Sequence, residues 1–318
     1  MAAPPDGVAR FGTHPRAGLP GAVTVYEVGL RDGLQNEATA VPTDVKLAMA
    51  GRLAAAGLRW IEATSFVRPD RVPQLADAED LVRQLPLDGP VAYPVLVPNR
   101  RGLDRALAAG ARHVAVFLSA TESFSERNIG CSRAEADRRA AEVVGEATAA
   151  GVPARAYLSM CFGDPWEGPV PVDTVADAVA DLASAGCHQV SIGDTIGVAT
   201  PGHVHQVVTA CTARGVAPGL LAFHGHDTYG QALANVLAAL EAGVTTVDSS
   251  AGGLGGCPFA GAATGNLATE DLLWMLGGLG IATGVDLVAV ADASRWLAGR
   301  LGRPSPSRVV AALAPTGS

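Results

Sequence analysis

Two histidines separated by a single residue, His224 and His226, give the chain its strongest chemical signal. They follow an apolar run that begins at Leu220, so we expect them at the end of a β-strand. Side chains two residues apart on an extended chain point to the same side, which lets both imidazoles face one point. A single histidine near a strand is usually structural. Two at this spacing, followed by Asp227, indicate a metal site.

Oxygen ligands for such a site are available at the ends of two other predicted strands. Asp32 follows the first strand and Asn266 follows the last. Together with His224 and His226 they would supply two nitrogens and two oxygens. Mixed imidazole and oxygen ligands with open positions suit a divalent ion that substrate and water also bind. A structural zinc site is not indicated, because no pair of cysteines has ligand spacing.

The segment from Glu27 to Glu37, E-V-G-L-R-D-G-L-Q-N-E, adds an Arg31–Asp32 pair where the first predicted strand ends. An isolated Arg-Asp pair is usually a surface ion pair, but here other strand ends supply partners for both residues. Glu62 and Asp194 are further carboxylates at strand ends in apolar surroundings. Each of these two is either a hydrogen-bonding brace or a proton-transfer group, and the pattern leaves both roles open.

A glycine-rich segment, Gly252 to Pro258, presents the thiol of Cys257. One reading is a phosphate cradle, because barrels often bind phosphate after the seventh and eighth strands. The dinucleotide fingerprint does not fit, since Pro258 stands where that pattern needs its last Gly or Ala. We interpret the segment as a mobile lid that delivers a functional thiol.

These residues are positioned by short apolar runs that alternate with Ala-rich amphipathic stretches. Each run is nearly continuous in apolar residues, as in parallel strands that are covered on both faces. An Ala-Gly or Arg-Gly pair ends six of the predicted helices, including Gly57 and Gly110. The predicted strands are Val23–Glu27, Trp60–Ala63, Ala92–Val97, His113–Leu118, Ala154–Met160, Gln189–Ile192, Leu220–His224 and Thr245–Asp248.

Helices are predicted between the strands and after the last one. The simplest closure of eight such strand–helix units is a (β/α)8 TIM barrel with extra C-terminal helices, and a doubly wound open sheet is the main competitor. All of the candidate residues would then open on one face. The predicted helices are Asp44–Ala56, Val72–Gln84, Arg100–Ala109, Arg133–Ala150, Asp173–Ala185, Pro201–Arg214 and Gln231–Ala242, followed by Thr269–Gly278 and Leu287–Leu301.

Composition limits the domain organisation and the classes of partner. We expect residues 1–20 to form a disordered or loosely packed tail and residues 21–318 a single catalytic domain. A formal net charge of -8 argues against nucleic acid as the main partner. Neither a basic amphipathic helix nor an apolar run of membrane-spanning length stands out, so we expect no membrane partner. The first twenty residues hold no continuous apolar segment, and we expect a cytoplasmic protein.

Long motifs in a fixed order give the chain a resemblance to a known family. They are E-V-G-L-R-D-G-L-Q-N-E, I-E-A-T-S-F-V, S-I-G-D-T-I-G, H-G-H-D-T-Y-G-Q-A-L-A-N and G-G-L-G-G-C-P-F-A-G-A-A-T-G-N-L-A-T-E-D. From about Val23 to Leu301 the chain resembles the 3-hydroxy-3-methylglutaryl-CoA lyases, which belong to the metal-dependent barrel lyases and condensing enzymes. Leu30 departs from the family, which commonly has Pro before the Arg, and residues 261–264 vary the linker before Asn266. These departures remove no chemical group.

The resemblance implies a carbon–carbon lyase that cleaves 3-hydroxy-3-methylglutaryl-CoA into acetyl-CoA and acetoacetate. It implies magnesium or manganese on Asp32, His224, His226 and Asn266. The residues that it places close to the reaction are Arg31, Glu62, Asp194, His224 and Cys257. With an acyl-CoA substrate, we expect Arg31 and Gln35 to contact it, Asp194 or His224 to take the hydroxyl proton, and Cys257 to protonate the carbanion. We also expect a homodimer or a higher homo-oligomer.

Other functions remain open at this level. One is a lyase for a longer branched 3-hydroxyglutaryl-CoA, since sequence does not size the acyl pocket. Another is a condensing enzyme of the same superfamily, although those usually carry a regulatory domain after the barrel. The remotest is an inactive barrel that acts as a binding scaffold, which the complete set of chemical groups speaks against.

Overall fold

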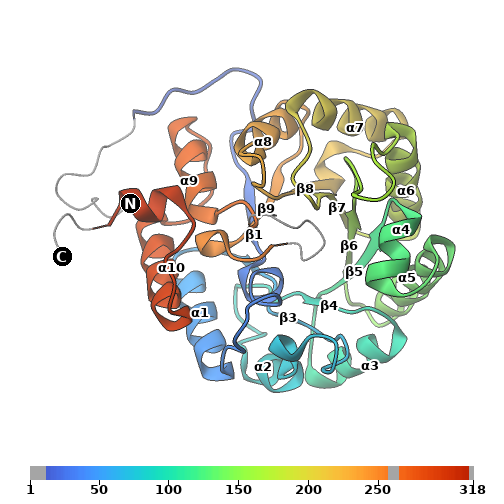
Figure 1. The fold of residues 1–318 in the computed structure, drawn as a ribbon, viewed down its shortest axis with the longest axis horizontal. Helices are drawn as coiled ribbons and strands as arrows, with labels where there is room; N and C mark the ends of the chain where they lie inside the picture. The colour runs from blue at the N-terminus through green and yellow to red at the C-terminus, as the bar shows by residue number, and fades with distance from the viewer. Residues whose placement is uncertain (1–11, 257–264, 315–318) are drawn as a thin grey trace.

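The computed structural model describes residues 12–256 and 265–314. Within these ranges a nine-stranded parallel sheet runs in the order β2-β1-β9-β8-β7-β6-β5-β4-β3. Figure 1 looks along the strands and shows the helices around them. The strands are β1 Thr24–Glu27, β2 Trp60–Ile61, β3 Thr64–Ser65, β4 Val95–Leu96, β5 Val114–Ser119, β6 Ala154–Ser159, β7 Gln189–Asp194, β8 Leu221–Gly225 and β9 Thr246–Ser249.

The sheet closes around the second predicted strand, Trp60–Ala63, whose first two residues form β2 and which is followed directly by β3. Its peptide groups bond alternately to both neighbours: Glu62 N donates to Glu27 O (2.8 Å), while Ala63 N donates to Pro94 O (2.9 Å). Pro94 has no N–H to return, which interrupts the ladder and shortens β4 relative to the predicted Ala92–Val97. The eight predicted strand positions therefore form a closed ring, and the expected TIM barrel is confirmed.

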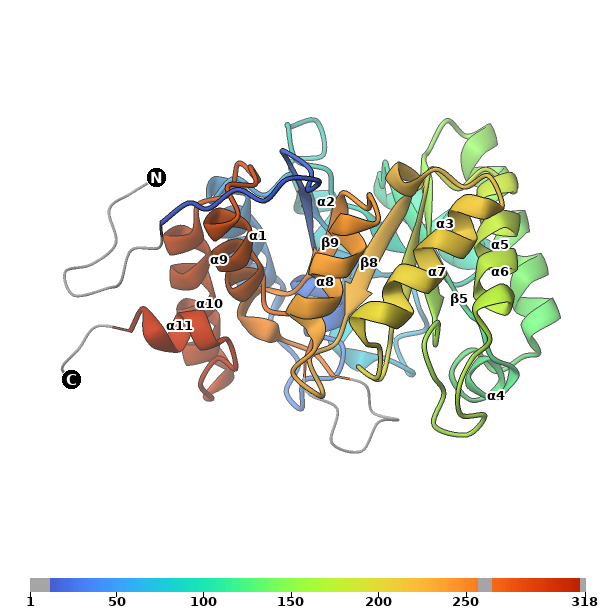
Figure 2. The same ribbon diagram turned by 90° about the horizontal axis from the view of Figure 1, so that it is seen from above.

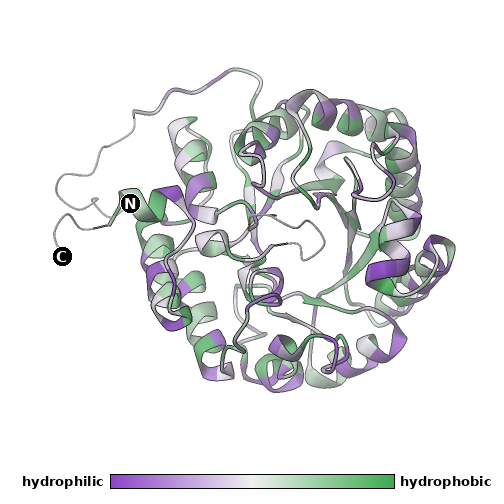
Figure 3. Ribbon diagram, viewed as in Figure 1, coloured by the Kyte–Doolittle hydropathy of each residue, from purple (hydrophilic) through white to green (hydrophobic). Residues whose placement is uncertain are grey.

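Helices cover the outside of the ring and, apart from α4 and α11, which the sequence did not predict, lie close to their predicted positions. Each carries both hydrophilic and hydrophobic residues, as expected for helices with one face on the barrel and one in water (Figure 3). The helices are α1 Thr43–Ala55, α2 Ala78–Gln84, α3 Arg100–Ala109, α4 Glu122–Phe124, α5 Arg133–Ala149, α6 Val172–Ser184, α7 Pro201–Ala213, α8 Ala232–Glu241, α9 Thr269–Gly278, α10 Leu287–Leu301 and α11 Arg308–Ala312.

One helix differs clearly from its prediction. The sequence predicts a single helix over Val72–Gln84, but only α2 and a short turn at Pro73–Leu75 are helical. The break falls at Asp77, whose carboxylate accepts hydrogen bonds from Lys46 Nζ (2.6 Å) and Thr43 Oγ1 (2.7 Å) of α1. These long-range bonds turn the Asp77 side chain toward α1, and its backbone is not helical.

The predicted glycine stops end their helices as expected. Gly110 has a φ of 98°, in the left-handed region that favours glycine, and its N–H closes α3 onto Ala106 O and Leu107 O. Gly57 has a φ of 104°, and a Cβ there would meet Gly284 O at 2.3 Å. The turn after α1 therefore needs glycine both for its conformation and for its close contact with the segment that precedes α10.

The C-terminal helices form the expected addition to the barrel. Figures 1 and 2 show α9, α10 and α11 grouped at one side of the ring, with α10 next to α1. The Arg52 guanidinium of α1 lies 4.6 Å from the Trp296 ring centre on α10. Residues 12–20 of the predicted tail form neither helix nor strand, and His14 N donates to Gly278 O (2.8 Å). No described helix has the length and apolar character needed to cross a bilayer.

Candidate active site and metal centre

The candidate residues collect at the carboxyl ends of the barrel strands. Arg31 and Asp32 lie in a buried helical turn, Gly29–Gly33, directly after β1. Glu62 lies between β2 and β3, and His224 lies in β8. The segment that begins at residue 265 lies beside His226. Leu267 N donates to Gly225 O (3.0 Å), and Asn266 forms an isolated antiparallel β-bridge with His226. Separate strand–helix units thus meet at one point, as the sequence predicted.

Three of the four predicted metal ligands form a compact donor set. One ligand atom from each of Asp32, His224 and His226 lies within 4.8 Å of the others, and all three residues are buried. His226 Nδ1 is 3.1 Å from Asp194 O, and His224 Nδ1 is 3.2 Å from Asp248 Oδ2. Because both Nδ1 atoms are engaged, Nε2 is the nitrogen that each histidine keeps for a cation.

The fourth predicted ligand, Asn266, fits the same centre. Its amide Nδ2 donates to Asp32 Oδ2 (2.8 Å) and to Leu254 O (3.0 Å). Its carbonyl Oδ1 is buried and has no hydrogen-bond partner among the described residues. An unpaired buried acceptor costs about 1–3 kcal/mol, so an oxygen left in this state on an amide that contacts the Asp32 carboxylate suits a cation ligand. The residues present therefore fit a divalent metal.

The protonation states favour the same interpretation. Burial alone raises the pKa of Asp32, but Arg31, His224 and His226 outweigh it and hold the pKa at about 2. Burial, aided by the neighbouring His224, lowers the pKa of His226 to about 4. At neutral pH these groups are a carboxylate and a neutral imidazole, which are the forms that bind metals.

Arg31 is held rigidly beside this donor set. Its Nε donates to Glu62 Oε2 (2.6 Å), and its Nη1 donates to Asp32 Oδ1 (2.5 Å). Its guanidinium carbon lies 5.1 Å from the Tyr157 ring centre. Glu62 Oε1 is buried without a hydrogen-bond partner among the described residues. Glu62 thus orients Arg31 through one oxygen and keeps the other one free.

The remaining described candidates, Gln35 and Asp194, have polar side-chain atoms engaged by other groups of the chain. Gln35 Nε2 donates to Asp32 Oδ1 (3.1 Å), so its predicted substrate contact competes with this bond. Asp194 ends β7, and its carboxylate accepts from Val198 N (2.8 Å) and Ala199 N (3.1 Å). Burial raises the pKa of Asp194 to about 6. Cys257 lies outside the described residues, so its role stays a prediction.

Sequence reasoning missed two carboxylates that support the site. Glu27 Oε1 accepts from Gly29 N and from Ala251 N (both 2.8 Å), and Glu27 Oε2 accepts from Thr269 Oγ1 (2.7 Å). Glu27 therefore joins the turn that carries Arg31 to the segment after β9. It stands in the same motif as Arg31, but no local pattern identifies its distant partners.

The second missed carboxylate is Glu270, the next residue after Thr269. Both of its oxygens accept from Gly252 N (3.0 Å), and Ser294 of α10 donates to it as well. Burial raises the pKa of Glu27 and of Glu270 to about 7 each. These two residues anchor the helical turn Ala251–Gly253, in which the glycine-rich segment begins.

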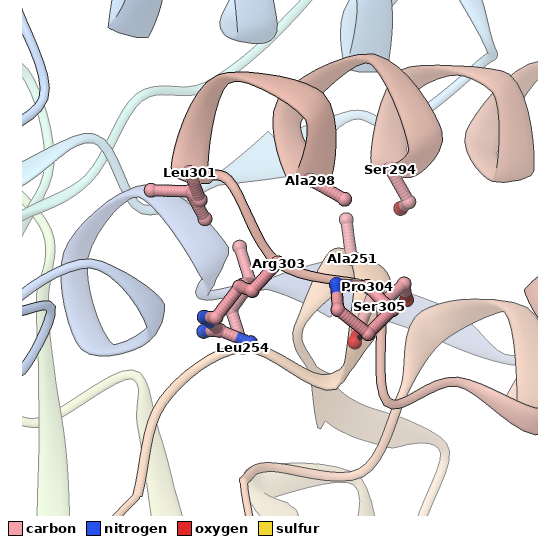
Figure 4. Close-up of a pocket in the computed structure, with 9 residues that line it drawn as sticks. Ala251, Leu254, Ser294, Ala298, Leu301, Arg303, Pro304 and Ser305 are labelled. Atoms are coloured by element: carbon pink, nitrogen blue, oxygen red, sulfur yellow. Dashed lines mark hydrogen bonds between the residues drawn. The ribbon is translucent and has the colours of Figure 1, made fainter.

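A pocket lies on the α10 side of that turn (Figure 4). It is a small hollow that is partly open to solvent, and Ala298, Leu301 and Arg303 help to line it. Ser305 Oγ, also in its wall, donates to Gly252 O (3.1 Å). None of the described residues that line it is a candidate ligand. The pocket therefore belongs to the support of the turn and not to the reaction centre.

Known proteins share this fold and most of this sequence. A family model described as HMGL-like matches residues 22–297. Mitochondrial hydroxymethylglutaryl-CoA lyase of Gallus gallus is 48% identical, over 92% of this chain and 97% of its own length. The crystal structure of hydroxymethylglutaryl-CoA lyase from Pseudomonas aeruginosa has a TM-score of 0.90 and 44% identity, covering 93% of this chain and 98% of that one.

A structure with bound ligands is also similar. An HMG-CoA lyase from Acinetobacter baumannii, in complex with coenzyme A and 3-methylmalate, has a TM-score of 0.88 and 35% identity. It covers 96% of this chain and 99% of its own. The family model spans most of the barrel, and the curated relative matches nearly from end to end. The chain belongs to the HMGL-like family.

Proposed function

We propose that this protein cleaves the C2–C3 bond of 3-hydroxy-3-methylglutaryl-CoA and releases acetyl-CoA and acetoacetate. The observation that carries the proposal is the convergence of Asp32, His224 and His226 within 4.8 Å at the barrel mouth. The unpaired Asn266 Oδ1 supports it. The lyase activity named for relatives at 48% identity over nearly the whole chain points to the same reaction.

We assign a divalent cation, magnesium or manganese, to Asp32, His224, His226 and Asn266. Oxygen and imidazole donors are ligands that such ions accept. When bound, the cation would supply Lewis acidity that lowers the pKa of a substrate hydroxyl and fixes its orientation. The chain contributes the buried, preformed donor set.

Arg31 stabilises the charge that develops on the substrate. When C2–C3 breaks, the hydroxyl oxygen becomes the ketone of acetoacetate, and the bonding electrons pass to C2 as a thioester enolate. A guanidinium is always cationic and presents a planar fork of donors to the enolate oxygen. Glu62 and the Tyr157 ring fix the plane of this fork before the substrate arrives.

Two further groups move protons. If His224 uses Nε2 for the cation and Nδ1 for Asp248, neither nitrogen is free to act as a base. We therefore assign the hydroxyl proton to Asp194, the other candidate. The proton that quenches the carbanion at C2 is assigned to Cys257 from the sequence, because a thiol is a stronger acid than a serine or threonine hydroxyl.

A panel of acyl-CoA thioesters, assayed with and without metal and with products identified by mass, tests the proposal. The metal-free protein should be inactive, and Mg²⁺ or Mn²⁺ should restore the production of acetyl-CoA and acetoacetate. Full turnover without metal would overturn the metal site. Turnover of only a longer branched 3-hydroxyglutaryl-CoA, or of a condensation, would overturn the substrate.

Assembly and location remain predictions. We propose a homodimer or higher homo-oligomer in the cytoplasm, with an acyl-CoA as the partner molecule. Coenzyme A in the similar Acinetobacter baumannii structure supports the acyl-CoA part of this proposal. The Gallus gallus relative carries a mitochondrial name and a Mus musculus relative a cytoplasmic one, so similar proteins are not confined to one compartment.

A further inference from the structure

A fully buried ion pair lies inside the barrel, behind the predicted metal ligands. Arg155 of β6 and Asp248 of β9 are each 1% exposed, and Arg155 Nη2 donates to Asp248 Oδ1 (2.5 Å). Ser191 Oγ of β7 donates to the second oxygen, Asp248 Oδ2 (2.8 Å). The same Oδ2 lies 3.2 Å from His224 Nδ1. The Nδ1 side of His224 thus contacts Asp248. Neither Asp248 nor its partners Arg155 and Ser191 have a role in the proposed reaction.

We propose that Asp248 is a positioning residue that holds His224 in the tautomer with hydrogen on Nδ1, and that Arg155 fixes Asp248 for this role. The inference rests on the proposed metal site. An ionised carboxylate offers only acceptors, so the nitrogen that faces it must donate. The lone pair of His224 then lies on Nε2, the nitrogen left for the donor set with Asp32 and His226.

Arg155 is itself held on several sides. Its Nη1 donates to Tyr157 Oη (2.8 Å), and its guanidinium carbon lies 3.9 Å from the Tyr26 ring centre. A cation beside Asp248 favours the carboxylate over the neutral acid, so Asp248 stays an acceptor. Burial strengthens this effect, because screening by water is absent. A buried ion pair contributes little net stability compared with apolar residues, which makes a positioning role the better account of its presence.

His226 is oriented in a different way. Its Nδ1 lies 3.1 Å from Asp194 O, a backbone carbonyl that no side-chain substitution removes. His226 therefore provides an internal control in the same protein. A change at Asp248 should alter the hydrogen position on His224 and leave that on His226 unchanged.

Nitrogen NMR of the metal-free wild-type protein, with labelled histidine, tests the tautomer without any mutation. His224 should show a protonated Nδ1 and an unprotonated Nε2 near pH 8. A protonated Nε2 on His224 would overturn the inference. This outcome does not depend on whether the protein cleaves any substrate, so it separates failure of the inference from failure of the proposed function.

Replacing Asp248 with Asn tests the consequence for the metal. The amide introduced by Asp248→Asn can turn its NH₂ toward His224 and release the other tautomer, so Mn²⁺ affinity by electron paramagnetic resonance should fall about 10- to 100-fold. Asp77→Asn is the matched control, because it breaks another carboxylate–cation pair, Asp77–Lys46 (2.6 Å), away from the site. Its Mn²⁺ affinity should stay at the wild-type value.

The outcomes are distinct. A folded Asp248→Asn protein with wild-type Mn²⁺ affinity and an unchanged His224 spectrum would overturn the positioning role. If this variant does not fold, the wild-type tautomer decides the question alone. Absence of Mn²⁺ binding by the wild-type protein would instead overturn the proposed metal site.

Discussion

Two groups of buried polar residues lie near the turn after β1, and they differ in whether all of their side-chain oxygens have a hydrogen-bond partner. The mouth group is Arg31, Asp32, Glu62 and Asn266, and the brace group is Glu27, Thr269, Glu270 and Ser294. Glu62 Oε1 and Asn266 Oδ1 of the mouth group have no partner among the described residues. Both carboxylates of the brace group have every oxygen occupied by a donor.

This difference separates chemistry from support. Buried polar atoms are normally satisfied, so the two acceptors left without a partner beside Arg31 and Asp32 suit a place where a cation or substrate completes the site. Glu27 and Glu270, whose oxygens all accept hydrogen bonds from the chain, instead fix a turn. Asp32 is the exception, because both of its oxygens accept from mouth residues or Gln35 and yet it belongs to the donor set. Burial and a raised pKa do not distinguish the two groups, because Glu62 of the mouth and Glu270 of the brace share both properties.

Asp194 tests this comparison most severely. Its carboxylate accepts hydrogen bonds from backbone N–H groups, like those of the brace group, and yet we propose it as the base that takes the substrate's hydroxyl proton. In Asp194→Asn the amide oxygen can still accept the hydrogen bond from Val198 N, but the side chain cannot act as a base. We expect kcat to fall about 100- to 10,000-fold, the usual contribution of general base catalysis. Steady-state kinetics and Mn²⁺ titration measure it, and the metal affinity should be retained. A kcat within a few fold of wild type would move Asp194 into the brace group.

Arg31 sharpens the mouth side of the comparison. Arg31→Lys keeps the charge but loses the planar fork that bonds Glu62 and Asp32, so kcat should fall about 100- to 1,000-fold. The loss should appear in kcat and leave KM nearly unchanged, as steady-state kinetics would reveal. Arg105→Lys is the matched control, because Arg105 donates to Glu79 (2.6 Å) on the outside of the barrel. A change confined to KM would make Arg31 a substrate anchor.

Glu270 tests the brace side and should give the smallest effect. Its pKa of about 7 in the folded protein lies above the ordinary value of 4.5, so the folded state binds the proton more tightly. The free energy of unfolding should then fall as pH rises from about 4.5 to 7, by at most about 1.4 kcal/mol per pH unit from this group. Glu270→Gln removes this contribution and should flatten the profile measured by urea unfolding.

The control for that profile is Glu142→Gln, on the exposed face of α5. Its curve should follow that of the wild-type protein. An equal flattening in both variants would show that Glu270 is not the buried titrating group. A loss of kcat in Glu270→Gln much larger than its loss of stability would place Glu270 in the mouth group.

The sequence predicted those features that depend on local pattern and on parallel strands. Short apolar runs and glycine stops located the barrel, and strand ends brought Asp32, His224 and His226 together, because the carboxyl ends of parallel strands share one face. The structure confirms this convergence. The Asp194 and Cys257 assignments remain predictions, since roles in proton transfer need a bound substrate to test them.

Other features depend on partners far apart in the chain. Glu27 bonds Ala251 N, and backbone N–H groups carry no signature in the sequence. The break before α2 depends on Lys46 of α1 reaching Asp77, which a local helical pattern does not reveal. The same holds for Asp248, because its acidic side chain inside a barrel becomes interpretable only when Arg155 and His224 are seen beside it.

The buried Arg155–Asp248 ion pair limits how this site could be grafted onto another barrel protein. Barrel interiors are usually filled with Val, Ile and Leu, so an engineered barrel would offer an apolar lining beneath any grafted loops. Such a graft would carry Arg31, Asp32 and Asn266, which lie outside the strands, but would leave behind Arg155, Ser191 and Asp248, which lie on strands. The smallest transferable unit is therefore the mouth together with the inner positions of β6, β7, β8 and β9.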